Sequence, residues 1–138
     1  MFPVAASAAG PTTLTQVASA TSTAQTITAL AGIRAGDLLV LCDFANSTTT
    51  TIPTAVVPTD FNIVTNSTLV EQGTSGARCI SSIKIANGTE AGASLIGMIA
   101  IGGGVVRKAL YVFRGNVQIT QITALDAASE FIDGDPAA

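Results

Sequence analysis

The sequence predicts an all-β protein, an antiparallel β-sandwich of jelly-roll type with about eight strands. The chain has 138 residues, which is the length of a single domain. Short apolar or alternating segments recur about every ten residues and are separated by Gly, Pro, Asn and Asp. This pattern is typical of antiparallel sandwiches and barrels, and it disfavours alternating strands and helices.

Three parts are expected along the chain: an extended N-terminal arm over residues 1–13, a β-sandwich domain over 14–122 and a C-terminal tail over 123–138. The arm consists of small residues with Pro3 and Pro11 and has no periodic apolar face. Such an arm either frays or lies across a neighbouring subunit.

The first strands are predicted from Leu14 onward. Residues 25–30 alternate between polar and apolar side chains, which indicates a half-buried strand. Residues 38–44 form a continuous apolar run of strand length that follows a turn at Gly36. Such a run predicts a central strand buried on both faces.

The next stretch is expected to hold only short strands. A polar loop covers residues 46–51, and Pro53 and Pro58 keep the following residues out of a central strand. Short strands are predicted over residues 61–64 and 69–71.

The second half of the domain shows the clearest alternation. Over residues 77–86, the odd-numbered side chains from Ala77 to Ile85 face one way, and the even-numbered ones, such as Lys84, face the other. Asn87-Gly88 then marks a turn. Further strands are predicted over residues 93–101, 105–113 and 117–122.

The C-terminal tail begins with a helix signal. Thr123-Ala124-Leu125-Asp126 resembles a capping box that opens a short helix through Phe131. The last residues, from Asp133, are acidic and are expected to be loose.

The composition excludes several classes of function. Charged residues make up 11% of the chain, against about 25% in ordinary domains. There is no His, which excludes Ser-His-Asp and Cys-His catalysis and imidazole metal ligands. The net charge of −3 lacks the basic footprint of a nucleic-acid binder. A surface rich in Thr and poor in charge favours packing against other subunits, although a secreted Thr-rich β-domain has the same composition.

The two cysteines and the N-terminus bear on the cellular compartment. Cys42 and Cys79 lie in strand-like runs and are expected to be reduced thiols, with a disulfide between adjacent strands as the alternative. Two thiols without His or a CxxC spacing do not predict a metal site. The N-terminus lacks a basic and apolar leader, and no apolar run reaches membrane-spanning length, so synthesis in the cytoplasm without membrane insertion is expected.

The remaining motifs predict no enzyme and no cofactor. Gly102-Gly103-Gly104 lacks the Lys-Ser/Thr and the helix of a phosphate-binding loop, so a hairpin loop is expected. The scattered carboxylates lack the aromatic platforms of sugar-cleaving sites, because the chain has no Trp and one Tyr. Arg114 follows an apolar run and is expected to pair with Asp37 or Asp43, to lie at a subunit contact, or to be a plain surface charge.

Four segments together resemble a known group of proteins: residues 35–41 with the letters GDLLV, residues 58–61, residues 83–92 ending in GTEAG, and residues 112–115 with FRG. Their order and spacing resemble a diffuse group of tailed-bacteriophage virion proteins that are β-sandwich modules of tails, fibres and capsid decorations. Asp60 stands where that pattern usually has Gly.

The resemblance implies a structural role without catalytic residues. A short chain of this kind suits a capsid decoration or cement protein that is made in the host cytoplasm and carried in the virion. Its partners would be the major capsid protein or other virion subunits, in a homo-oligomer whose symmetry stays open, a trimer being one arrangement. A tail, baseplate or head-fibre component and a carbohydrate-binding, adhesin-like sandwich are the alternatives. The candidate assembly contacts are Phe2, Pro3, Val4, Arg114 and Phe131.

Overall fold

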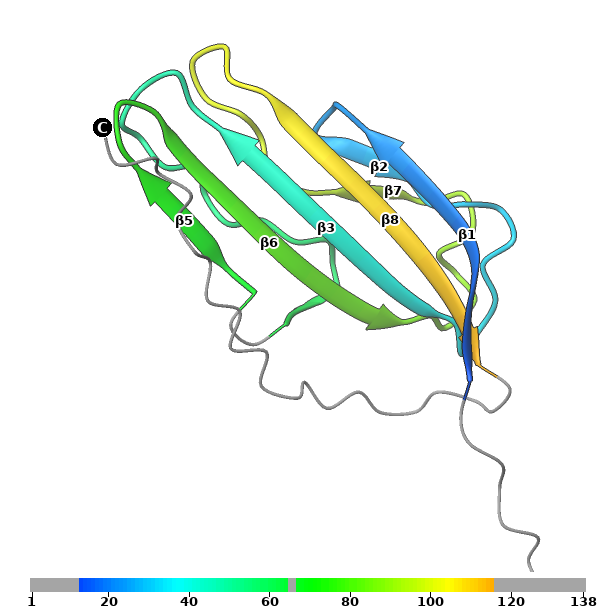
Figure 1. The fold of residues 1–138 in the computed structure, drawn as a ribbon. Helices are drawn as coiled ribbons and strands as arrows, with labels where there is room; N and C mark the ends of the chain where they lie inside the picture. Colours follow the sequence, from blue (N-terminus) through cyan, green and yellow to red (C-terminus); the bar gives the residue numbers. More distant parts are fainter. Residues whose placement is uncertain (1–12, 65–66, 116–138) are drawn as a thin grey trace, which may run out of the picture.

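The computed structural model describes residues 13–64 and 67–115, and these residues form eight strands in two antiparallel sheets (Figure 1). The predicted all-β antiparallel class is confirmed, and no helix occurs in these two ranges. The strands are β1 (Leu14–Ser22), β2 (Thr26–Thr28), β3 (Leu38–Asn46), β4 (Asn62–Ile63), β5 (Leu69–Gln72), β6 (Gly76–Ile85), β7 (Ser94–Ile96) and β8 (Val106–Gly115).

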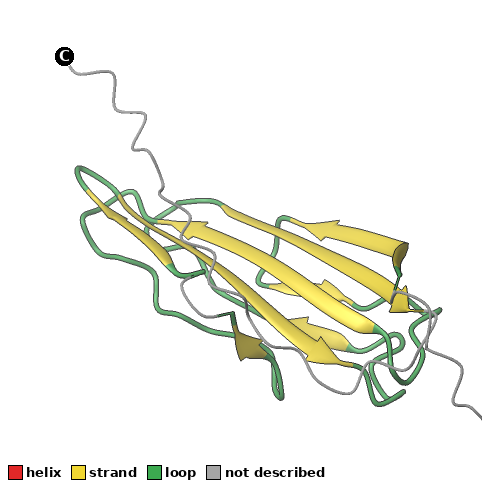
Figure 2. Cartoon of the chain, turned by 60° about the horizontal axis from the view of Figure 1, so that its bottom comes forward, coloured by secondary structure: helices red, strands yellow, loops and turns green. Residues whose placement is uncertain are grey.

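The larger sheet has the strand order β1-β8-β3-β6-β4, and β5 also pairs with β6. The smaller sheet consists of β2 and β7. Figures 1 and 2 show the long strands β1, β8, β3 and β6 side by side in one layer, with β2 and β7 behind them in a sandwich-like arrangement. The second layer is therefore much smaller than the sheet that it covers.

The core lies between the two layers. On the larger sheet it consists of alternate residues of the central strands, such as Leu39 and Leu41 of β3 and Leu110 and Val112 of β8, which are at most 1% exposed. The smaller sheet contributes one buried residue from each strand, and the loops add others. These are Ile27, Ile33, Phe61 and Leu95.

The prediction that residues 38–44 are buried on both faces is wrong. Along β3, buried residues alternate with half-buried ones, and Val40 and Phe44 belong to the half-buried set. The strand is central in its sheet, as its apolar run indicated, since β8 and β6 flank it. However, the small second layer covers only one face of that sheet.

The predicted strand over residues 93–101 is also shorter in the structure, since β7 ends at Ile96. The N–H of Met98 donates a hydrogen bond to the Asp43 side chain at 2.7 Å instead of joining a strand ladder. Ile101 forms an isolated bridge with Ser47. Likewise β2 covers only three residues of the strand predicted over 25–30.

Several predictions concern residues outside the described ranges. These are the arm up to residue 12, the strand over 117–122 and the short helix through Phe131. The first strand of the domain begins at Leu14, where the sequence predicted it.

Candidate functional site

The larger sheet has an outer face, by which we mean the face turned away from β2 and β7. Strand register determines which side chains share it. Leu38 of β3 lies opposite both Phe113 of β8 and Ile85 of β6. Two residues along, Val40 lies opposite Tyr111 and Ile83. These six half-buried side chains form one contiguous cluster, which we call the apolar end.

The other end of the outer face carries its charges. Arg107 lies opposite Phe44, Phe44 opposite Cys79, and Cys79 opposite Leu69, so one row crosses β8, β3, β6 and β5. Glu71 follows on β5, opposite Ala77. We call this region the charged end, because Arg107 and Glu71 are the only charged residues among the described strand residues on the outer face.

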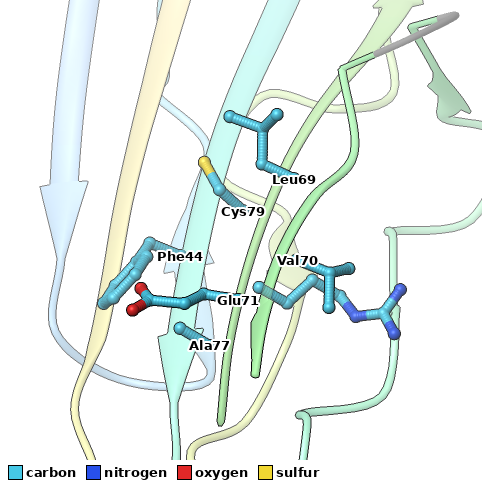
Figure 3. A pocket seen from close by; sticks show the side chains of 7 residues that line it. Phe44, Leu69, Val70, Glu71, Ala77 and Cys79 are labelled. Atoms are coloured by element: carbon cyan, nitrogen blue, oxygen red, sulfur yellow. The ribbon is translucent and has the colours of Figure 1, made fainter. Parts of the chain in front are cut away.

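A depression of about 450 Å³ lies at the charged end. Phe44, Leu69, Ala77 and Cys79 supply its apolar lining, and the carboxylate of Glu71 extends across it toward the ring of Phe44 (Figure 3). Arg78 also lines the depression, and its Nε donates to the carbonyl of Pro53 at 2.7 Å. The carboxylate of Glu71 over an apolar floor is suited to a long cationic side chain, whose stem is apolar and whose head is charged.

A buried ion pair lies beneath the opposite face of the sheet. The ammonium of Lys108 lies 2.5 Å from Oδ1 of Asp43, and both side chains are at most 3% exposed. The ammonium also donates to the carbonyl of Met98 at 2.9 Å, while Asp43 Oδ2 accepts the Met98 N–H. The pair thus joins β3 and β8 to the segment after β7.

A second ion pair holds the start of β3 to the end of β8. Arg114 donates through Nε and Nη2 to both carboxylate oxygens of Asp37, each at 2.7 Å. These hydrogen bonds are the main cause that lowers the pKa of Asp37 below its usual value, against the opposing effect of burial. Of the alternatives that the sequence left open for Arg114, the structure shows pairing with Asp37.

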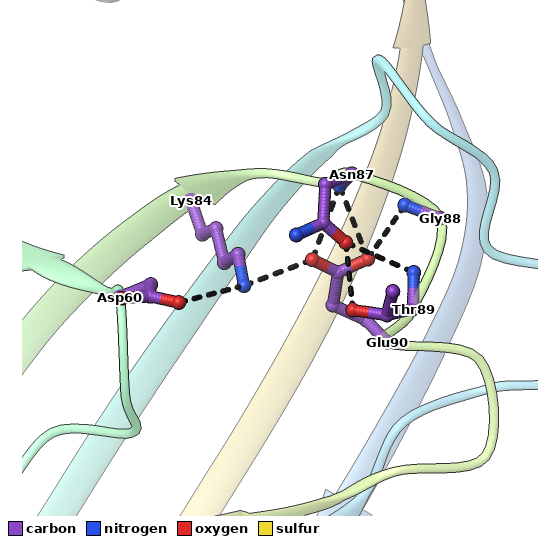
Figure 4. Close-up of polar contacts among 6 residues, drawn as sticks. All are labelled: Asp60, Lys84, Asn87, Gly88, Thr89 and Glu90. Atoms are coloured by element: carbon purple, nitrogen blue, oxygen red, sulfur yellow. Dashed lines mark hydrogen bonds and ion pairs between the residues drawn. The ribbon is translucent and has the colours of Figure 1, made fainter.

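A third buried carboxylate, Glu90, organises the turn after β6 (Figure 4). It accepts the N–H groups of Asn87 and Gly88 and lies 2.9 Å from the ammonium of Lys84. Burial alone would raise its pKa. The Lys84 ammonium and the backbone donors outweigh this effect, so the pKa of Glu90 is lowered. Lys84 also lies 3.8 Å from the exposed carboxylate of Asp60.

These three carboxylates are all engaged by cations or N–H donors, so each acts as a link between segments of the fold. In the described part of the chain, every buried side-chain nitrogen and oxygen has a hydrogen-bond partner. The same residues contain no cluster of three or more His, Cys, Asp or Glu side chains that could hold a metal ion. No helix among them is long and apolar enough to cross a membrane.

The two cysteines are free and half-buried on neighbouring strands of the outer face. Ser81 lies opposite Cys42, with its Oγ 3.9 Å from the sulfur, and Cys79 lies two residues away on β6, opposite Phe44. Burial raises the pKa of the Cys79 thiol. Of the two alternatives, the structure therefore has free thiols.

The outer face is the feature that sequence reasoning missed. The candidate contacts Phe2, Pro3, Val4 and Phe131 lie outside the described residues, and Arg114 lies away from this face. A signal was present, because the odd-numbered residues of β6 include Ile83 and Ile85 while the even-numbered ones include Lys84. Alternation alone did not tell which of these two sets the second layer covers.

Comparison of the chain with protein-family models, with curated proteins and with solved structures finds no match.

Proposed function

We propose that this chain is a non-enzymatic structural protein of a tailed-phage virion, a capsid decoration or cement protein that binds and stabilises the head shell. The observation that carries the proposal is the outer face, an apolar sheet surface that the second layer leaves uncovered. The solvated face of an antiparallel sheet is ordinarily polar. A broad apolar patch on a small domain instead marks a surface that is buried against another protein.

The size of the patch gives the proposal its energetic basis. Burying apolar surface contributes roughly 25 cal/mol per Å². The apolar end alone joins six large side chains on three adjacent strands. Because only Arg107 and Glu71 carry charge among the described strand residues of this face, little desolvation of charge opposes its burial. The protein is therefore suited to be one subunit of an assembly.

The resemblance to tailed-phage virion proteins supplies the kind of assembly, and the structural roles of the motif residues support it. The GDLLV and FRG segments meet through the ion pair between Asp37 and Arg114. The carboxylate of the GTEAG segment, Glu90, closes its own turn. Asp60 has a φ of 65°, the conformation that favours the Gly of the family pattern.

The proposal is tested by purifying phage particles from a lysate that contains this chain and measuring their protein composition. Quantitative mass spectrometry should find the chain on the particles in hundreds of copies, as expected for a shell component. A few copies per particle would place it in the tail or a fibre and overturn the decoration assignment. Absence from particles would overturn the virion assignment altogether.

A binding experiment tests how attachment occurs. Purified protein is added to particles that lack it, and bound protein is measured after sedimentation. Introducing a charge at the apolar end, by Val40→Lys, should reduce attachment, whereas Gly73→Ala in an open turn should not. Deletion of residues 1–11 tests the predicted arm separately, because undiminished attachment would remove Phe2, Pro3 and Val4 from the contacts.

A further inference from the structure

We propose that the outer face packs against the outer face of a second copy of this chain, about a two-fold axis that runs along the strands between β3 and β6. The inference rests on the proposed function and makes it more specific: a second copy covers this surface, and the chain attaches to the particle as a dimer, through other surfaces. It is carried by the arrangement of the two charged side chains and the apolar end on one sheet.

The two charges are placed symmetrically about the middle of the sheet. Arg107 lies on β8 and Glu71 on β5, with β3 and β6 between them. Three strand spacings separate them, about 14 Å across the sheet. The midline of this span falls between β3 and β6. Along the strand direction, Glu71 lies two residues beyond the row that contains Arg107, a distance of about 7 Å.

A two-fold axis along this midline turns a second copy over so that its β5 faces β8 of the first. Each Arg107 then faces Glu71 of the other copy, and the pair forms twice. The two apolar ends also face each other, because rotation about an axis along the strands preserves position along them. Charge and apolar surface are thus both matched in one arrangement.

The alternative face-to-face arrangement has its axis across the strands, and it mismatches both features. Each strand would then lie over the same strand of the second copy in reverse direction, so the apolar end would lie on the charged end. Arg107 and Glu71 would be buried against apolar side chains without a partner of opposite charge. Burial of an unpaired charge disfavours association, so the pattern on this face selects the axis along the strands.

The depression at the charged end provides the seat for the Arg107 side chain of the second copy. Its apolar stem would lie on Phe44 and Leu69, and its guanidinium would reach the Glu71 carboxylate at the rim (Figure 3). Arg is suited to this task, because its planar fork pairs with a carboxylate through two hydrogen bonds.

The area is sufficient for a stable dimer. The axis between β3 and β6 opposes four strand positions of each copy, from β8 to β5. A face four strands wide and eight to ten residues long measures roughly 19 by 30 Å. Two such faces would together bury about 1,100 Å², above the roughly 1,000 Å² that a specific protein–protein interface needs. Face-to-face sheet packing about ten ångströms apart is also the standard geometry of sandwich cores.

The experiment is a charge exchange on the full-length protein, with the association state measured by sedimentation velocity over a range of concentrations. The wild-type chain should be dimeric at micromolar concentration. Arg107→Glu alone and Glu71→Arg alone should each weaken dimerisation about tenfold or more, because each places like charges together. The double variant R107E/E71R should restore the dissociation constant of the dimer to within about threefold of the wild-type value.

Two controls separate association from folding. Arg34→Glu makes the same charge change at an exposed position in the loop before β3 and should leave the dimer unchanged. Val40→Lys should give a monomer whose circular dichroism retains the β-sheet spectrum of the wild type.

A wild-type chain that stays monomeric at about 100 µM, or single reversals that the double variant does not rescue, would overturn the proposed dimer. The outcome is separable from the proposed function. A monomeric chain that is present on particles in hundreds of copies would overturn the dimer and leave the decoration role standing. If the double variant restores the dimer but the protein does not attach to particles, the dimer stands and the decoration role is overturned.

Discussion

Lys108 shows how single residues hold the two layers together. Its ammonium lies in the interior with Asp43 and the carbonyl of Met98 as partners. A buried charge is stabilising only while it is paired, since removing one partner leaves the other desolvated without compensation. Asp37 and Glu90 follow the same principle closer to the ends of the strands. Among the residues that the structure describes, six of the eleven charged side chains belong to these three links.

Replacing Lys108 by Met tests the buried pair. The variant should lose about 3–5 kcal/mol in the free energy of unfolding, because the Asp43 carboxylate stays buried without its cation. Adding Asp43→Asn should recover part of the loss, since the amide oxygen can still accept the Met98 N–H. Urea denaturation measures both. A loss below about 1 kcal/mol in the single variant would contradict the role assigned to the pair.

Asp60→Gly tests the strained turn before β4. Asp60 has a φ of 65°, and Phe61 N–H closes the turn on the carbonyl of Pro58. Glycine adopts this conformation without strain, so the free energy of unfolding should rise by about 0.5–1 kcal/mol in the variant. Thermal denaturation measures this change. The variant also loses the 3.8 Å ion pair with Lys84. Because the Asp60 side chain is exposed, this pair contributes little to stability. Asp60→Ala is the matched control, and it should not stabilise.

At the scale of elements, the segment that follows β7 passes directly against the buried pair. A Cβ on Gly97 would collide with Oδ2 of Asp43 and lie 2.7 Å from Nζ of Lys108. The buried pair therefore requires a residue without a side chain at this place. β7 itself ends one residue earlier, at Ile96, and the N–H of Met98 then bonds to Asp43 of the larger sheet.

Gly97→Ala should accordingly destabilise the protein by about 2–3 kcal/mol, since the methyl group displaces two charges that have no other partners to move to. The control is Gly73→Ala, where a Cβ meets nothing within 4 Å. That variant should change stability by less than about 0.5 kcal/mol. Equal midpoints of urea denaturation for the two variants would contradict the close packing of Gly97 against the buried pair.

At the scale of the whole molecule, carboxylates with lowered pKa values make stability depend on acid. Asp37 and Glu90 have usual pKa values of 3.8 and 4.5, and both are lowered in the folded protein. Such groups stabilise the fold fully above their usual pKa, and this contribution is lost as the pH falls through the folded values. The acid dependence should therefore begin near pH 4.5 and continue below it.

We expect the free energy of unfolding to be nearly constant between about pH 7 and pH 5 and to fall below that. Asp37→Asn should be less stable at neutral pH and should lose less on acidification, because the neutral amide does not titrate. Urea denaturation at several pH values measures this difference. Equal acid losses in the variant and the wild type would contradict the role of the pair with Arg114.

The scarcity of surface charge makes a second prediction at this scale. Attachment to particles should change less than about threefold between roughly 50 and 500 mM NaCl, because few exposed ion pairs are available to be screened. Cosedimentation at both salt concentrations gives the comparison. A steep loss of attachment with salt would show that charged surfaces carry the contact with the particle.

The sequence by itself determined where the strands lie. Runs such as 38–44, 77–86 and 105–113 predicted β3, β6 and β8 to within two residues at each end, because alternation and turn residues are local properties of the chain. The pair of Arg114 with Asp37 was one of several alternatives that the sequence left open, beside Asp43, a subunit contact and a plain surface charge.

Only the tertiary structure decided which faces are buried. The same alternating pattern is compatible with cover on either side of a sheet, since burial depends on which side the second layer packs against. Here β2 and β7 pack against the side that carries Leu39, Leu41, Leu110 and Val112, a contact between segments far apart in the chain. The other side therefore becomes the apolar outer face, the surface of the proposed contact between copies.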